Sequence, residues 1–104
     1  MKILTISLLN QKEGVYYCQE GDTIASIANR FSTSKELIVK DNHLTCEVKK
    51  GDCIYIKRYK KVYTVMVGDT PETVAKKLGI SVDEMFRINR INYVYPFMQV
   101  VGYD

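Results

Sequence analysis

The chain has 104 residues and a formal net charge of +3, from 15 lysine and arginine residues against 12 acidic residues. This length accommodates one ordinary domain or two very small ones and excludes large enzyme folds such as the (β/α)8 barrel, which needs about 250 residues. Apolar residues make up 46% of the sequence and charged residues 26%, which indicates a globular protein rather than a disordered one.

The first predicted element is a strand over residues 2–9, where apolar and polar side chains alternate. Polar residues 10–13 follow it directly in place of a small-residue cleavage site. We therefore expect no signal peptide and synthesis in the cytoplasm. No apolar run approaches the roughly 18 residues that span a bilayer, so we expect no membrane span.

From residue 16 onward the sequence repeats itself at an offset of 47 residues. Over the 27 positions from 16 to 42 the two copies share seven identities: Tyr16 with Tyr63, Gly21-Asp22-Thr23 with Gly68-Asp69-Thr70, Ala28 with Ala75, Ser34 with Ser81, and Asn42 with Asn89. Because these identities fall at turn, cap and core positions, we interpret the chain as two copies of one structural unit.

Each copy predicts the same four elements. Residues 15–19 and 62–67 are rich in β-branched and aromatic side chains and predict strands. A Gly-Asp-Thr turn then leads into a first helix, whose N-cap is the Asp or the Thr; Pro71 at the first helical position favours Thr70. Gly79 predicts the end of that helix in the second copy. Second helices begin at Ser34 and Ser81, and Ser81 opens a capping box. Closing strands are predicted over 53–57 and 99–101.

The cysteines predict neither disulfides nor metal binding. Cys18, Cys46 and Cys53 are odd in number and contain no C-x-x-C pair, so we expect free thiols in small apolar positions. His43 lies three residues before Cys46, but no third residue that would orient a catalytic pair is evident. We predict no metal, no cofactor and no catalytic residue.

The repeated motif resembles the LysM domain. The resemblance rests on a Tyr separated by four residues from Gly-Asp-Thr, a helix with Ile-Ala or Val-Ala, a short break, a Ser, and a second helix ending in Asn. It covers roughly residues 15–57 and 62–102. The second copy is the better match. The first departs at Ser32 and Asp41, where Gly and an apolar residue are usual, and the second departs at Phe97, where Gly is usual.

This resemblance implies an α+β fold of two consecutive βααβ modules, each a two-stranded antiparallel sheet packed on a helix pair. We predict an N-terminal strand and connector over residues 1–13, a first module over 14–57, a short linker over 58–61 and a second module over 62–104.

The resemblance also implies a non-catalytic protein that binds N-acetylglucosamine-containing glycans, either peptidoglycan or chitin-like oligomers, at a bacterial cell wall or spore envelope. The family's groove lies between the loop before the first helix and the loop after the second. Carried over to the second module, its contacts are Gly68, Asp69, Thr70, Pro71, Asn89, Arg90, Ile91, Asn92 and Tyr93, with Tyr95 beside them. In the first module, the weaker binder, they are Gly21, Asp22, Thr23, Ile24, Asn42, His43 and Leu44.

Three other functions are compatible with parts of the sequence. A protein-interaction module with degenerate sugar sites would suit spore-coat, phage-tail or cell-wall assembly. Residues 74–88 mimic a DNA-binding helix-turn-helix, but Asp83 and Glu84 at the start of the second helix would repel phosphate, so we expect no nucleic acid partner. A glycoside hydrolase would need two paired carboxylates, whereas Asp22 and Asp69 look like helix caps.

Overall fold

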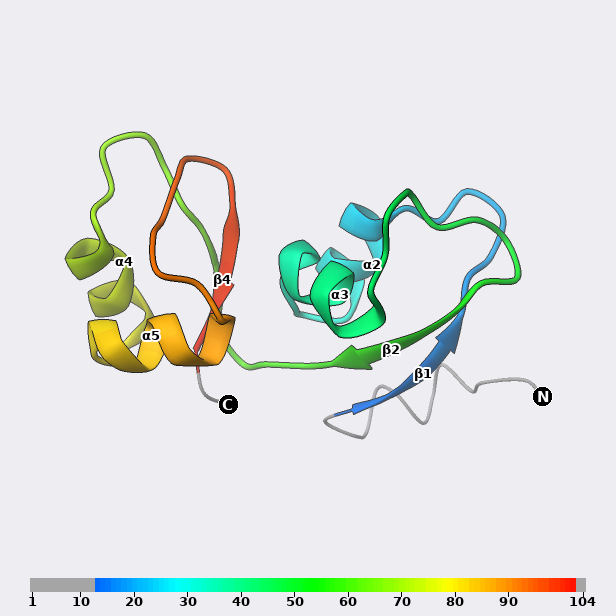
Figure 1. Cartoon of the computed structure of the whole chain (residues 1–104), viewed down its shortest axis with the longest axis horizontal. Helices are drawn as coiled ribbons and strands as arrows, with labels where there is room; N and C mark the ends of the chain where they lie inside the picture. Colours follow the sequence, from blue (N-terminus) through cyan, green and yellow to red (C-terminus); the bar gives the residue numbers. More distant parts are fainter. Residues whose placement is uncertain (1–12, 103–104) are drawn as a thin grey trace. The chain divides into compact units, whose positions relative to one another are not determined.

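A computed structural model of the chain describes residues 13–102 (Figure 1). The strand predicted over residues 2–9 lies outside the described residues. The chain divides into two compact units between Arg58 and Tyr59, which we call unit 1 and unit 2. Each unit has the order strand, helix, helix, strand, which confirms the predicted α+β fold of two βααβ modules.

Unit 1 is built on one antiparallel strand pair. β1 (Glu13–Tyr17) is followed by α2 (Ile24–Arg30), α3 (Lys35–Asn42) and β2 (Cys53–Lys57). β1 pairs with β2, with Glu13 opposite Lys57 and Tyr17 opposite Cys53. The helices pack on this sheet (Figure 1). The core contains buried side chains from the strands, the helices and the segments that flank them, namely Tyr16, Cys18, Ile27, Ala28, Phe31, Ile38, Val48, Ile54 and Ile56.

Unit 2 repeats this arrangement with shorter strands. Its elements are β3 (Val62–Thr64), α4 (Pro71–Leu78), α5 (Val82–Asn89) and β4 (Gln99–Val101). β3 pairs antiparallel with β4, and it ends earlier than predicted because the chain beyond Val65 turns. The core contains Val65, Val74, Ala75, Leu78, Met85, Met98 and Val100.

Side-chain oxygens begin all four helices as expected. Thr23, Ser34, Thr70 and Ser81 are the N-caps, and each accepts a hydrogen bond from the backbone N–H three residues later. The predicted capping box between Ser81 and Glu84 and the predicted Pro at the start of α4 are both confirmed. The capping residues are the threonines of Gly-Asp-Thr. This confirms Thr70, which Pro71 favoured, and it shows that the interpretation of Asp22 and Asp69 as caps is wrong.

Left-handed backbone ends three of these helices. Gly79 has φ of 76° at the end of α4, as predicted, while α3 and α5 end at His43 (φ 53°) and Arg90 (φ 55°). In unit 1 the position of Gly79 is occupied by Ser32, which adopts φ of 56° despite its side chain. The departure from glycine at Ser32 therefore leaves the turn geometry in place, at the cost of a less favourable backbone conformation.

One asparagine in each unit joins the second helix to the closing strand. Asn89 at the end of α5 accepts a hydrogen bond from the N–H of Val101 at 2.9 Å and donates to the carbonyls of Val101 at 3.0 Å and Met85 at 2.9 Å. Asn42 bonds in the same way to both backbone groups of Tyr55 and to the Ile38 carbonyl. Each amide thus occupies the edge of a strand as a neighbouring strand would.

The asparagines also show where the two units differ in length. Asn42 lies 13 residues before its strand partner and Asn89 lies 12 residues before its own, so the loop after the second helix is one residue shorter in unit 2. Val48 is buried in unit 1, and Val94 packs against the core in unit 2. Aligning these valines makes Glu47 correspond to Tyr93, Lys49 to Tyr95 and Gly51 to Phe97.

The thiols are free but only one is in an apolar position. Cys18 is buried, and burial raises the pKa of its thiol to about 11. Cys46 and Cys53 are exposed, so the expectation of apolar positions is wrong for these two. Cys46 lies in a loop, and Cys53 is the first residue of β2, on the exposed face of the sheet. Within residues 13–102 no helix is long and apolar enough to cross a membrane.

Replacing Asn89 with Ala should lower the free energy of unfolding of unit 2 by about 3 kcal/mol, because it leaves the Val101 N–H and two carbonyls without their partner in the interior. Asn42→Ala should cost less, since Asn42 is only half-buried. Urea unfolding monitored by circular dichroism would measure both changes. The exposed Asn92→Ala variant is the control, and an equal loss in that variant would contradict the assignment.

Candidate functional site

The loop between β1 and α2 is held in shape by one carboxylate. Asp22 accepts hydrogen bonds from the Tyr16 hydroxyl at 2.6 Å, the Gln19 N–H at 2.7 Å and the Arg30 guanidinium at 2.9 Å. Arg30 also lies over the Tyr16 ring, 5.6 Å from its centre. The carboxylate therefore ties the strand, the turn and the first helix together.

Unit 2 repeats this network with a different cation. Asp69 accepts from the Tyr63 hydroxyl, from the Met66 N–H at 2.9 Å and from the Thr73 hydroxyl at 2.9 Å. The Lys77 ammonium lies 3.2 Å from the Tyr63 oxygen and 4.9 Å from its ring centre. Arg30 and Lys77 stand 47 residues apart, in the register of the repeat, but neither was among the residues predicted for the site.

These contacts change the acidity of both aspartates. Burial by itself would raise the pKa of Asp22, but the hydrogen bonds from Tyr16, Gln19 and Arg30 outweigh it, and the net pKa is lowered. The pKa of Asp69 is also lowered, chiefly by the bond from Tyr63 and then by the one from the Met66 N–H. Both groups serve as fixed anions, which is a structural role rather than that of a general acid.

The second groove loop starts at the left-handed caps. His43 and Arg90 are exposed there, and the next residues, Leu44 and Ile91, pack against the cores of their units. The Leu44 N–H donates to the Val39 carbonyl at 3.0 Å, and the Ile91 N–H bonds to the Phe86 carbonyl in the same way. The helix ends thus place the two loops of each unit against the same core.

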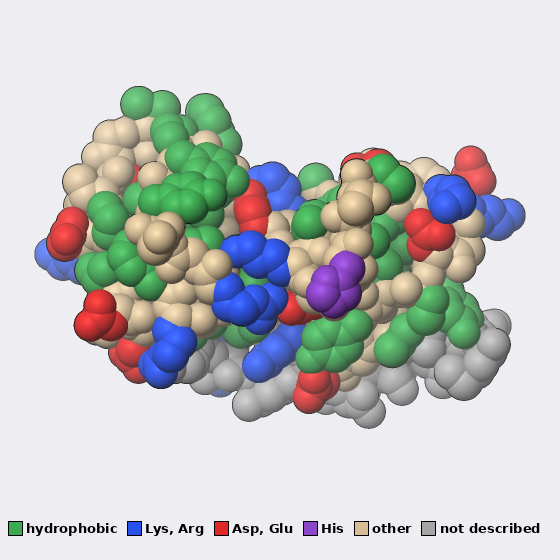
Figure 2. Space-filling model, in the orientation of Figure 1, with side chains coloured by type: hydrophobic (Ala, Val, Ile, Leu, Met, Phe, Trp, Pro, Cys, Tyr) green, Lys and Arg blue, Asp and Glu red, His purple; other side chains and the backbone are tan. Residues whose placement is uncertain are grey.

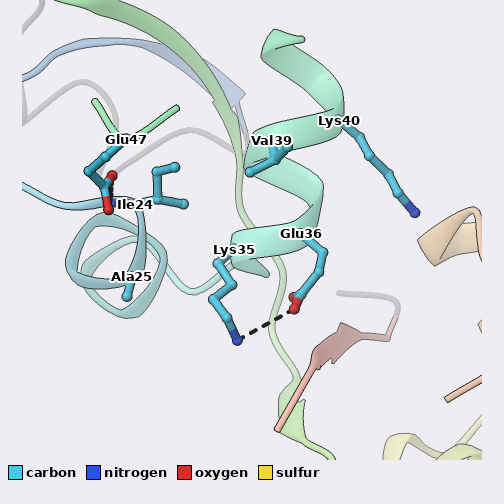
Figure 3. A pocket seen from close by; sticks show the side chains of 7 residues that line it. All are labelled: Ile24, Ala25, Lys35, Glu36, Val39, Lys40 and Glu47. Atoms are coloured by element: carbon cyan, nitrogen blue, oxygen red, sulfur yellow. Dashed lines mark hydrogen bonds and ion pairs between the residues drawn. The ribbon is translucent and has the colours of Figure 1, made fainter. Parts of the chain in front are cut away.

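In unit 1, residues of α2 and α3 and one residue of the loop after α3 line an open cavity of about 410 Å³ (Figure 3). Ile24, Ala25 and Val39 supply its apolar surface, and the charged side chains around it are Lys35, Glu36, Lys40 and Glu47. Glu47 comes from the loop between α3 and β2, and its Oε1 accepts a hydrogen bond from the Ile24 N–H at 2.7 Å. Glu47 therefore connects the loop after α3 to the first residue of α2 beside the cavity.

In unit 2 the corresponding loops carry exposed apolar side chains. The large hydrophobic residues exposed within 13–102 are Met66, Val67, Tyr93, Tyr95 and Phe97, all of them from this unit. Figure 2 shows hydrophobic side chains gathered over the part of unit 2 that holds its two long loops in Figure 1. The rings of Tyr93 and Tyr95 are stacked, with centres 5.6 Å apart. We call these five residues the apolar tip.

Phe97 in this tip has an unfavourable backbone. Its φ is 74°, and the equivalent position in unit 1 is Gly51 with φ of 94°. Although Phe97 is 64% exposed, its ring occupies a position where glycine would be less strained.

The predicted site residues do not all have the same role. Asp22 and Asp69 hold the first loop of their units through hydrogen bonds. Asn42 and Asn89 bond to the closing strands, and both amide hydrogens of each are used within the unit. Of the residues predicted for unit 1, Ile24 lines the cavity. Glu47, Val39 and Lys40 line it as well. None of the three was predicted: Val39 and Lys40 lie on α3, outside the two predicted loops, and Glu47 lies where the copies differ in length.

The structure gives little support to DNA binding, metal binding or glycoside hydrolysis. Strands flank the helix pair of unit 2, α4 and α5, where a DNA-binding helix-turn-helix would be expected to pack on further helices. Among the described residues no group of three or more His, Cys, Asp or Glu side chains is arranged to hold a metal ion. Asp22 and Asp69 belong to different units, and each is engaged in its own loop.

Comparison with known proteins supports the resemblance. The model of the LysM domain family matches residues 16–48 and 63–99. Among solved structures, the chain is similar to the spore cortex-lytic enzyme SleL of Bacillus cereus, at 18% identity and a TM-score of 0.44 over 88% of this chain and 23% of that chain. It is also similar to SleL of Bacillus megaterium QM B1551, at 27% identity and a TM-score of 0.42, over 86% of this chain and 22% of that chain. The chain thus spans less than a quarter of either enzyme. No match is found among curated proteins.

Asp22→Asn should reduce the free energy of unfolding at pH 7 by about 1–2 kcal/mol, because the bonds to Tyr16 and Arg30 lose their charged acceptor. The folded-state pKa lies below the unfolded value of about 3.9, so this stabilisation is present above that value and is lost as the pH falls through the folded pKa. Urea unfolding at neutral and acid pH should show the two proteins converging in acid. A difference that stays constant with pH would contradict the network, and Glu20→Gln is the exposed control.

Phe97→Gly should stabilise unit 2 by about 0.5–1 kcal/mol, and Gly51→Phe should destabilise unit 1 by a similar amount, since both positions have positive φ. A Cβ at Gly51 would meet no atom within 4 Å, so its cost is one of backbone conformation. Thermal unfolding of the two variants would measure these opposite shifts. Loss of stability in Phe97→Gly would show instead that the ring contributes to folding.

Proposed function

This chain belongs to the LysM domain family, and from that premise we propose that it is a non-catalytic binding protein for N-acetylglucosamine-containing glycans. Peptidoglycan is the favoured polymer, and chitin-type oligomers are the related alternative. Modules of this family bind glycans and are not catalytic. The proposed place of action is a bacterial cell wall or spore envelope.

The stacked pair of Tyr93 and Tyr95 is the observation that carries the proposal for unit 2. Both rings are exposed, and they follow directly on the predicted groove residues Ile91 and Asn92. An aromatic ring offers a flat apolar face with a polar edge, which suits a sugar ring that has apolar C–H groups on its faces and hydroxyls around its rim. A glycan in the groove would extend onto this pair.

The cavity of unit 1 supports a second binding position. Its volume of about 410 Å³ falls within the range of small-molecule sites, and its Ile24, Ala25 and Val39 side chains form an apolar surface for an acetyl group or a sugar face. Two modest sites in one chain would bind a polymer more tightly than either does alone, provided that both can engage it together.

One observation favours a second candidate function. Met66, Val67 and Phe97 extend the apolar tip beyond the tyrosine pair, and exposed apolar clusters often mark protein-binding surfaces. A protein partner from a cell wall, spore coat or phage tail would be a natural occupant. In that case the tip would retain its importance for assembly while glycan binding would be absent.

Calorimetric titration with N-acetylglucosamine oligomers of increasing length tests the proposal. Wild-type protein should bind, more tightly as the oligomer lengthens, and Tyr93→Ala should weaken binding about tenfold through loss of the ring face. Tyr93→Phe is the matched control, because it keeps the ring and should stay within about twofold of wild type.

Absence of heat with every oligomer, together with no co-sedimentation with purified peptidoglycan, would reject the glycan proposal and favour the protein-interaction module. Equal affinity in Tyr93→Ala and wild type would show that the glycan binds elsewhere than on the tyrosine pair. Thermal unfolding of each variant would confirm that the fold is unchanged.

A further inference from the structure

Glu47 gives the groove of unit 1 a chemistry that unit 2 lacks. We propose that Glu47 determines the selectivity of unit 1, so that this groove favours a glycan with free, protonated amines over a fully N-acetylated one. The inference rests on the proposed glycan-binding function and names the class of sugar that one of the two sites prefers.

The Glu47 carboxylate already occupies the backbone donors at one side of the cavity. Its Oε1 accepts from the Ile24 N–H at 2.7 Å and from the Val48 N–H at 2.9 Å. Ile24 also lines the cavity, so its N–H is a donor that a ligand carbonyl would otherwise use. A neutral acetyl oxygen is a weaker acceptor than a carboxylate, so an N-acetyl group gains little by competing for this position.

The second carboxylate oxygen is available to a ligand. Within the described part of the chain, Oε2 of Glu47 has no hydrogen-bond partner, and the side chain is exposed. An acceptor oxygen that carries charge is best matched by an ammonium donor. The amine of a de-N-acetylated glucosamine unit is such a donor, and it also lacks the acetyl carbonyl whose binding position Glu47 takes.

Neither lysine that lines the cavity forms an ion pair with Glu47 in the described part of the chain. Lys35 lies 3.4 Å from the carboxylate of its neighbour Glu36 and so is paired with it. In Figure 3 the Glu47 side chain lies beside Ile24, whereas Lys40 extends away from Ile24 on the far side of α3. An amine bound against Ile24 would therefore meet Glu47 first.

Unit 2 has neither half of this contact. Pro71 stands at the position of Ile24 and has no N–H, and Tyr93 stands at the position of Glu47. The ring of Tyr93 is 56% exposed and stacks on Tyr95, so this groove presents a neutral aromatic surface. Unit 2 therefore provides an internal reference for the same fold without the carboxylate.

The experiment is a two-dimensional amide NMR titration of the full chain, which reports on the two units separately. The ligands are an N-acetylglucosamine oligomer and a glucosamine oligomer of equal length, in a mildly acidic buffer in which the amines are protonated. Amides of unit 1 should titrate with about fivefold tighter affinity for the glucosamine oligomer, the upper range for one exposed charge pair. Amides of unit 2 should favour the N-acetylated oligomer.

Three variants assign the preference to one side chain. Glu47→Gln keeps the shape and an acceptor for the Ile24 N–H but removes the charge, and it should abolish the preference of unit 1. Glu47→Ala should also free the Ile24 N–H and raise the affinity of unit 1 for the N-acetylated oligomer severalfold. Glu20→Gln removes the same charge from an exposed position outside the cavity and should leave the preference unchanged.

The outcomes separate this inference from the proposed function. If unit 1 of the wild type favours the N-acetylated oligomer, or if Glu47→Gln and Glu20→Gln alter the preference equally, the role of Glu47 is rejected while glycan binding stands. If neither unit responds to either oligomer, the proposed function fails and the inference fails with it. The amide spectrum of Glu47→Gln without ligand, unchanged outside the loop, would establish that the variant is folded.

Discussion

The hydrogen bonds from one asparagine amide to one strand residue hold each unit together. A two-stranded sheet is marginal on its own, and a unit of this size buries only a small core. Asn42 and Asn89 overcome this by bonding both backbone groups of a strand residue and a carbonyl of their own helix. The end of the second helix is thereby fixed on the sheet, and both groove loops start from fixed positions.

The same frame carries two different surfaces. In unit 1 the groove loops are joined by a carboxylate next to an apolar cavity, whereas in unit 2 they expose stacked aromatic rings. The aspartate network behind the first loop is repeated in both units, with Arg30 replaced by Lys77. The supporting contacts are therefore repeated, whereas the exposed positions of the loop between the second helix and the closing strand have diverged.

Most of the fold could be predicted from the sequence because the two copies of the repeat provide two sequences for the same set of elements. Caps such as Thr70 and Ser81, the stop at Gly79 and the closing strands all depend on local chemistry that a short window of sequence shows. The roles of Asp22 and Asp69 were misjudged, since the Tyr16 and Tyr63 hydroxyls that donate to them come from the preceding strands and are brought close only by the fold. Glu47 could not be identified for a similar reason, because its contact with Ile24 spans 23 residues and falls where the copies differ in length.

That difference in length has a consequence for how such loops can vary. A residue gained or lost within a strand would turn every following side chain to the opposite face of the sheet. Here the extra residue lies in the loop between the asparagine and the strand. The asparagine amide bonds to Tyr55 in unit 1 and to Val101 in unit 2, so the strand residue at this position is fixed by hydrogen bonds and not by the length of the loop. The loop can therefore lengthen, shorten or be exchanged between units while the strand keeps its phase. Loop sequences could therefore be exchanged between modules of this kind, because the residues that fix the strand lie outside the loop.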